Sequence, residues 1–104
     1  LFESWEKQGV LLLNTSFSCI PNSPESHSLL WKDFSQQLIE YISEKYELRW
    51  FLWGKRALSM KPLIKKGIFF LSRHPMLCSP RYEDDFLKSD CFASTKHIIN
   101  WPGI

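Results

Sequence analysis

Cysteine is scarce in this sequence, and long hydrophobic runs are absent. The three cysteines, Cys19, Cys78 and Cys91, are an odd number without metal-ligand spacing, so we expect free thiols in a reducing compartment. No apolar run approaches the roughly 18 residues of a membrane-spanning helix, and no signal-peptide pattern is present. With 104 residues the chain has room for one domain at most, which we expect to span residues 1–104.

Charge of one sign is not dominant either. The net charge of +2 neither requires nor excludes nucleic acid as a partner. An apolar content of 44% is sufficient for a globular core, which argues against disorder. The chain begins with Leu rather than Met, inside a helical pattern, so we expect a fragment, a processed chain or an incomplete gene model.

Three short apolar runs have the length and composition of strands. They cover residues 10–13, 48–53 and 67–72. The first consists of four consecutive apolar residues between Gly9 and Asn14, a pattern typical of a strand that is buried on both faces. Because helical segments alternate with these strands, the sequence predicts an α/β fold with a parallel sheet.

The helical segments differ in the clarity of their pattern. The clearest covers residues 30–46, where apolar residues recur with the spacing of an amphipathic helix, and Ser28 is a candidate cap for it. We expect a helix end at residues 1–8 and a last helix at 92–99. A weak helix at 55–66 contains Pro62, which disfavours a helix interior.

Polar side chains follow the predicted strands at the edge where parallel strands end. Asn14 follows the first strand and offers hydrogen-bond donors and an acceptor; the alternative is a plain turn residue. His74 follows the third strand. It is a candidate electrophile or hydrogen-bond donor; the alternative is an ordinary surface histidine. Gly54 and Lys55 follow the second strand and suit a phosphate, although such cations are often only solvated. Ligands bind at this edge of open parallel sheets, so we expect these loops to converge.

Residues 5–15, WEKQGVLLLNT, closely resemble the core segment of family 1 uracil-DNA glycosylases. Later landmarks follow in the order of that family: Ser26-His27 with Trp31, Leu52-Trp53-Gly54, His74-Pro75 with Ser79, the segment 92–95, and Asn100-Trp101. The run from Gln8 to Asn14 is specific by itself, and the others carry weight together. The resemblance implies a three-layer αβα fold around a short parallel sheet, of which this chain is the carboxyl-terminal half.

The resemblance also implies a mechanism. These enzymes flip uracil out of the duplex and hydrolyse its glycosidic bond. Asn14 would read the Watson–Crick edge of uracil, because one carboxamide supplies an acceptor for N3–H and a donor for O4. His74 would bind uracil O2 and stabilise the negative charge of the leaving base. The implied DNA contacts are Gly54, Lys55, Leu77, Ser79 and Arg81. Neither a metal nor a cofactor is implied.

The loop after His74 departs from the family pattern. Met76 stands where the family has Ser, and Cys78 stands where it has the Leu that enters the base stack. Leu77, next to it, would serve as the wedge with a shifted backbone. Poxviral members also depart in this loop and share the short spacing between His27 and Trp31, so we expect viral or divergent relatives.

The amino-terminal half of the family is missing from the sequence. That half carries a Gly-Gln-Asp-Pro-Tyr-His motif, whose Asp positions the water, and a Phe that stacks on uracil. Asp33, Asp84, Asp85 and Asp90 lack such surroundings. We therefore expect the water-positioning Asp upstream of this chain, and an exposed apolar edge where the sheet is incomplete.

The favoured function is therefore uracil-DNA glycosylase in base excision repair. The alternative is a catalytically inactive glycosylase-fold module that binds DNA or a partner, as a replication or processivity subunit or a truncated isoform. Met76 and Cys78 favour the alternative, and an inactive fragment is a third hypothesis. The implied partners are uracil-containing DNA and a replication protein or a proteinaceous glycosylase inhibitor. The implied location is intracellular, in the nucleus or at a viral or cellular site of DNA replication.

Overall fold

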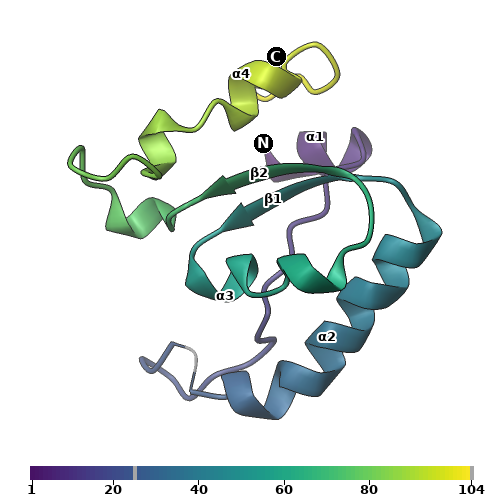
Figure 1. Ribbon diagram of the computed structural model, residues 1–104, viewed down its shortest axis with the longest axis vertical. Helices are drawn as coiled ribbons and strands as arrows, with labels where there is room; N and C mark the ends of the chain where they lie inside the picture. The colour runs from purple at the N-terminus through teal and green to yellow at the C-terminus, as the bar shows by residue number, and fades with distance from the viewer. Residues whose placement is uncertain (25, 104) are drawn as a thin grey trace.

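The computed structural model describes residues 1–24 and 26–103. In this part of the chain, helices surround a small parallel sheet (Figure 1). In chain order the elements, with 3-10 helices written η, are α1 Phe2–Lys7, α2 Ser28–Lys45, β1 Arg49–Trp53, α3 Lys55–Leu58, η1 Lys61–Leu63, β2 Ile68–Ser72, η2 Pro75–Leu77, η3 Phe86–Lys88 and α4 Cys91–Thr95. The α/β class predicted from the sequence is confirmed.

The sheet consists of β1 and β2, which pair in parallel with Trp50 opposite Phe69. Two further backbone bonds extend the ladder beyond the strands. Ile68 N donates to Leu48 O at 3.0 Å, and Gly54 N donates to Ser72 O at 2.9 Å. The chain crosses from one strand to the other through α3 and η1, as a parallel pair requires. The strands expected at 48–53 and 67–72 are therefore confirmed.

One face of β1 supplies the hydrophobic core. The core residues are Ile39, Trp50, Leu52, Met60 and Ile64, each at most 9% exposed. Trp50 and Leu52 alternate along the strand, so their side chains share one face. Helix α2 turns Ser35, Ile39 and Ser43 inward, at the spacing of one helical face. The helix predicted at residues 30–46 is thus confirmed.

The opposite face of β1 packs against aromatic residues from the C-terminal segment. Phe51 lies 5.7 Å from Trp101 between ring centroids, and Trp53 lies 4.9 Å from Phe86. Phe92 joins them, 4.9 Å from Trp101, in edge-to-face geometry. Such pairs add to the free energy that area burial provides. Helices thus flank the strands, while the three-layer arrangement and the single domain over residues 1–104 stay predictions.

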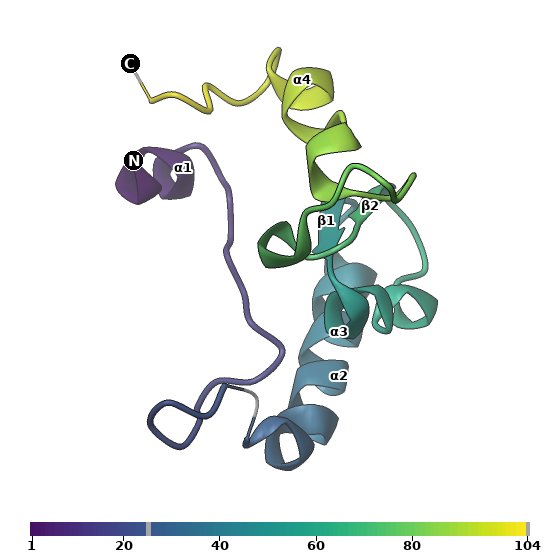
Figure 2. The same ribbon diagram turned by 90° about the vertical axis from the view of Figure 1, so that its left-hand side faces the viewer.

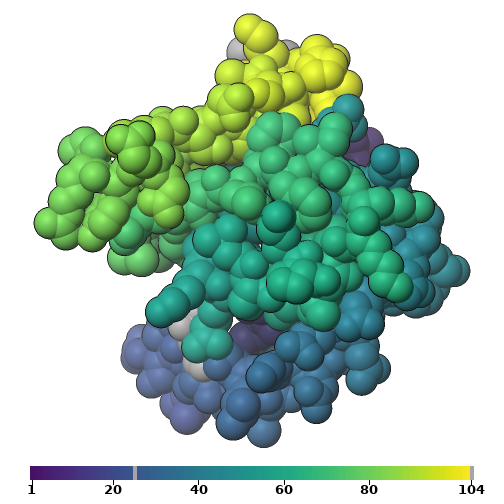
Figure 3. Space-filling view, viewed as in Figure 1, coloured from purple at the N-terminus to yellow at the C-terminus, as the bar shows by residue number. Residues whose placement is uncertain are grey.

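The strand expected at residues 10–13 is wrong. Leu11, Leu12 and Leu13 are 68%, 55% and 40% exposed and form no element of secondary structure. A strand needs a neighbour for its backbone N–H and C=O groups, and no described segment pairs with this run. Figure 2 shows the run as a separate column beside the sheet. In Figure 3 the α3–β2 segment hides most of it from view.

Three helices also differ from expectation in their boundaries. The weak helix expected at 55–66 is split, because α3 ends at Leu58 and η1 begins anew with Pro62 in its first turn. Ser28 is the first residue of α2 rather than its cap; His27 precedes the helix and makes no side-chain capping bond. The last helix is shorter than the predicted 92–99, since α4 ends at Thr95.

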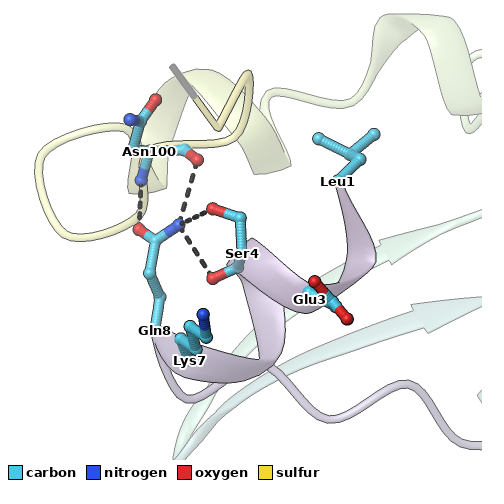
Figure 4. A pocket seen from close by; sticks show the side chains of 6 residues that line it. All are labelled: Leu1, Glu3, Ser4, Lys7, Gln8 and Asn100. Atoms are coloured by element: carbon cyan, nitrogen blue, oxygen red, sulfur yellow. Dashed lines mark hydrogen bonds between the residues drawn. The ribbon is translucent and has the colours of Figure 1, made fainter.

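Helix α1 is held by the loop at the other end of the chain. Trp5 Nε1 donates to Trp101 O at 2.8 Å. Gln8 makes two bonds with one residue: its Nε2 donates to Asn100 O at 3.1 Å, and its Oε1 accepts from Asn100 N at 2.6 Å (Figure 4). The helix end predicted at residues 1–8 is confirmed, and this contact ties it to the aromatic cluster beside β1.

Candidate functional site

The loops that leave β1 and β2 touch each other at the carboxyl edge of the sheet. Gly54 directly follows β1 and has φ +92°, a region that L-residues with a side chain rarely adopt. A Cβ built on Gly54 would lie 3.0 Å from His74 Cβ and 3.2 Å from its Cδ2. Glycine at this position therefore lets the two loops approach to van der Waals contact, with His74 at the contact point.

His74 has a defined hydrogen bond on one ring nitrogen. Its Nδ1 accepts from Met76 N at 3.1 Å, where His74 precedes η2. Because an accepting Nδ1 carries no proton, the neutral ring carries its proton on Nε2. The side chain is exposed, so Nε2–H is available as a donor toward an oxygen atom of a ligand.

The loop after His74 is built around a buried carboxylate. Asp85 is 2% exposed, and its Oδ1 accepts from Ser79 N at 2.6 Å while its Oδ2 accepts from Leu87 N at 3.0 Å. Bonds from backbone N–H groups to an ionised carboxylate are among the stronger ones and compensate for its burial. Sequence reasoning missed this role, although an Asp just before a helical turn is the usual pattern of a cap.

Two arginines flank one tyrosine ring in this loop. The Arg73 guanidinium carbon lies 3.6 Å from the Tyr82 ring centroid, and that of Arg81 lies 5.0 Å from it. Arg81 also donates to the Tyr82 hydroxyl at 2.9 Å. Cation–π contacts of this kind fix the guanidinium groups while leaving their N–H groups for other acceptors. The sequence prediction named Arg81 and missed the other two residues.

The exposed tip of the loop is apolar. Met76 is 86% exposed and Leu77 is 60% exposed, directly after His74. Leu77 N donates to His74 O at 2.9 Å, so the turn itself is ordered. Cys78 Sγ donates to Pro75 O at 2.8 Å and is thereby turned onto the backbone of the loop. Leu77 thus has the exposure that an inserting side chain requires, and Cys78 is engaged within the turn.

Asn14 is exposed and lies in the run beside the sheet. Its successor Thr15 lines a hollow of about 380 Å³, together with Lys32 of α2 and with Arg56 and Ser59, which lie in and just after α3. The segment of Asn14 thus lies next to the helix that follows Gly54. Within residues 1–24 and 26–103, no hydrogen bond joins Asn14 to His74. The structure brings Gly54 and His74 together and leaves Asn14 on a neighbouring segment.

Other parts of the surface offer less chemistry. A larger hollow of about 540 Å³ lies between α1 and the C-terminal loop and shares no residue with the loops above (Figure 4). Across the described residues, His, Cys, Asp and Glu side chains form no group of three that could hold a metal ion. In the same part of the chain, none of the helices combines the length and the apolar character needed to cross a bilayer.

Comparison with known proteins gives a consistent result. The chain is 36% identical over 99 residues to a protein from Campylobacter lari, and 42% identical over 83 residues to one from Human herpesvirus 7. A third protein, from Aliarcobacter butzleri, is 38% identical over 97 residues. All three are named uracil-DNA glycosylase. The chain is similar to uracil-DNA glycosylases.

The extent of this similarity is asymmetric. The Campylobacter lari match covers 91% of this chain but 42% of that glycosylase. The corresponding shares are 76% and 32% for the herpesvirus protein, and 91% and 45% for the Aliarcobacter protein. The chain thus spans less than half the length of these curated uracil-DNA glycosylases, which include bacterial and viral proteins. No family model matches the chain.

Proposed function

We propose that this protein acts as a uracil-DNA glycosylase, hydrolysing the N-glycosidic bond of a flipped-out uracil in base excision repair. The observation that carries the proposal is the 36% to 42% identity to uracil-DNA glycosylases, over 91% of the chain in the Campylobacter lari match. Its substrate is then uracil-containing DNA. A replication protein or a proteinaceous inhibitor is a further partner that the same family resemblance suggests.

His74 is the proposed catalytic residue. Because its Nδ1 accepts from Met76 N, the neutral ring carries its proton on Nε2, which is then the donor. In the proposed complex it bonds uracil O2 and stabilises the negative charge that develops there as the glycosidic bond breaks. A pre-positioned donor of this kind acts on the transition state more than on the ground state.

Asn14 is the proposed reader of the base. One carboxamide offers an acceptor to N3–H and a donor to O4 of uracil, whereas cytosine presents the reverse pattern at these two atoms. The proximity of Thr15 to residues of α3 supports a place for this segment on the same side of the sheet as Gly54. In the proposed complex the base lies between Asn14 and His74.

The remaining residues of the site are proposed to hold DNA. Gly54 precedes α3 beside His74 and Lys55 begins the helix, where the Lys55 backbone N–H and its cation suit a phosphate. Ser79 is held in place by Asp85, and Arg81 lies against Tyr82 with further N–H groups to offer. Leu77 is the proposed wedge in the base stack, in keeping with its exposure.

The water-positioning carboxylate is proposed to lie in the part of the fold that this chain does not span. Asp85, in the loop after His74, is buried and accepts bonds from two backbone N–H groups, so it is not proposed to activate water. Asp90 accepts from the Ser94 hydroxyl at 2.8 Å. These bonds are in keeping with an Asp upstream of residue 1.

A second candidate function is a catalytically inactive module that binds DNA or a partner protein. The exposed leucines at residues 11–13 favour it, because they offer an apolar surface for another chain. Met76 and Cys78 in the wedge loop favour it as well. This hypothesis predicts DNA or partner binding without base release.

A chimera tests the first candidate against the second. Residues 1–104 would replace the matching segment of a Campylobacter jejuni uracil-DNA glycosylase, to which the chain is 38% identical over 104 residues. Uracil release from a single-stranded oligonucleotide would be read as alkali-labile strand breaks. We expect release, and a fall of roughly 100- to 1,000-fold in His74→Ala, the usual effect of removing one such donor.

The control for His74→Ala is His97→Ala, since His97 is also exposed but lies in the turn after α4. It should release uracil at the parental rate. A chimera that unfolds cooperatively yet releases no uracil would contradict the proposal, and a DNA-binding titration would then test the second candidate. Equal rates for the His74→Ala and parent chimeras would remove His74 from the catalytic role.

A further inference from the structure

A buried serine of α2 holds the backbone directly after Asn14. Ser35 Oγ donates to Thr15 O at 2.5 Å, and Ser35 is 3% exposed. The two residues are 20 positions apart, so the bond joins α2 to a segment without secondary structure. A buried hydroxyl must find a partner, and the Thr15 carbonyl supplies the acceptor.

The chain on the carboxyl side of Asn14 is also fixed to α2. Phe17 packs edge to face against Trp31 and Phe34, with ring centroids 5.1 and 5.6 Å apart. Trp31 Nε1 donates to Ser18 Oγ at 2.8 Å. Residues 11–13, on the other side of Asn14, are exposed, and no strand in the described part of the chain pairs with them. Asn14 therefore lies between an exposed segment and a segment that is fixed to α2 by hydrogen bonds and aromatic contacts.

We propose that Ser35 is the positioning residue for Asn14. Its hydroxyl fixes the Thr15 carbonyl in the peptide unit between Thr15 and Ser16, and so restrains the chain one residue after Asn14. The inference rests on the proposed function, in which Asn14 reads uracil. Reading a base through two hydrogen bonds requires the carboxamide to be held in place, and a displacement of about 1 Å can cost about 100-fold in rate.

Helix α2 provides a matched comparison in Ser43. Ser43 is 0% exposed and lies on the same face of the helix as Ser35, eight residues later. Its Oγ accepts from Lys65 N at 3.0 Å, between η1 and β2. Both serines thus bond a distant backbone group from a buried site, but only Ser35 bonds the segment of Asn14. A purely structural role of Ser35 would leave uracil binding as insensitive to its substitution as to that of Ser43.

The first measurement is the NMR order parameter of the backbone of this chain, which needs no enzymatic activity. In Ser35→Ala we expect greater backbone mobility confined to residues 14–18, and in Ser43→Ala greater mobility around residue 65. Ser35→Thr keeps the hydroxyl and should restore the parental order parameters. If Ser35→Ala unfolds the chain, Ser35→Cys, which retains a similar shape and a weaker donor, takes its place. Equal mobility at 14–18 in the Ser35 and Ser43 variants would overturn the proposal.

The second measurement is inhibition of the Campylobacter jejuni chimera by free uracil. We expect Ser35→Ala to weaken inhibition about tenfold, as imprecise placement of a binding group does, with parental inhibition in Ser43→Ala and recovery in Ser35→Thr. Unchanged inhibition in an active Ser35→Ala chimera would overturn the positioning role alone. A parent chimera that releases no uracil would instead overturn the proposed function, and the role of Ser35 in reading uracil with it.

Discussion

Two regions of the molecule are both apolar in sequence but differ in burial and in secondary structure. Leu52 in β1 is 7% exposed, whereas Leu12 in the run beside the sheet is 55% exposed. The first lies on a strand with a parallel neighbour, and the second has no strand beside it among the described residues. Hydrogen-bond partners, rather than apolar side chains alone, therefore decide which of the two segments becomes a strand.

The same difference separates the two principal residues of the proposed site. His74 is placed by the sheet, since it follows β2 and contacts the glycine that follows β1. Asn14 is placed by side chains of α2 that reach the residues after it. Each half of the site thus depends on a different set of contacts, and substitutions should affect one without the other.

The largest expected effect on stability comes from truncating the leucine that is buried in β1. Leu52→Ala removes buried methyl groups from the core and should lower the free energy of unfolding by about 3 kcal/mol. Leu12→Ala is the matched control and should change it by less than about 0.5 kcal/mol, because that side chain is already half in solvent. Urea unfolding of both variants measures the difference. Similar losses would mean that the run beside the sheet has a packed partner.

The second comparison uses two glycines with nearly equal backbone angles. Gly54→Ala should cost about 2 kcal/mol, from strain at φ +92° and from contact with His74. Gly9 has φ +90° with no atom within 4 Å of its added Cβ, so Gly9→Ala should cost only the strain, about 1 kcal/mol. Thermal melts give both values. A Gly9→Ala variant as unstable as Gly54→Ala would argue against the contact at His74.

The smallest effect concerns the attachment of α1. Trp5→Phe keeps an aromatic ring against Trp101 but loses the bond to its carbonyl, a change of about 1 kcal/mol. We expect faster amide exchange in α1 and no change in β1. The control Trp31→Phe loses the bond to Ser18 and should leave α1 protected. Exchange that rises equally in β1 would show that the two regions unfold as one unit.

The elements that could be predicted from the sequence are those whose backbone hydrogen bonds lie within the element or with a neighbouring strand. Helix α2 followed from the spacing of its apolar residues, and β1 and β2 from short apolar runs that pair with each other. The run at 10–13 is also a short apolar run, but sequence composition does not reveal whether a neighbouring strand is present. Pro62 correctly indicated that a helix over residues 55–66 would be interrupted, since α3 ends at Leu58 and Pro62 lies in the first turn of η1.

The candidate site shows the same limit. The order of strand ends predicted that residues after β1 and β2 would meet, and Gly54 does contact His74. The roles of these residues stay predictions. The hydrogen bonds that hold the backbone around these residues could not be predicted from the sequence. Ser35 bonds Thr15 from 20 positions away, and Asp85 accepts from backbone groups on both of its sides. Buried polar side chains of this kind have no periodic pattern.

The buried carboxylate of Asp85 also bears on how this loop can evolve. It binds the backbone of Ser79 and Leu87 through N–H groups, which every residue except proline possesses. The shape of the loop thus does not depend on which side chains stand at its tip, where Met76 is 86% exposed. Mutations can accumulate at the tip without unfolding the loop, so the same loop backbone can carry different side chains at the position that enters the base stack. The unusual residues that follow His74 are therefore compatible with an intact scaffold.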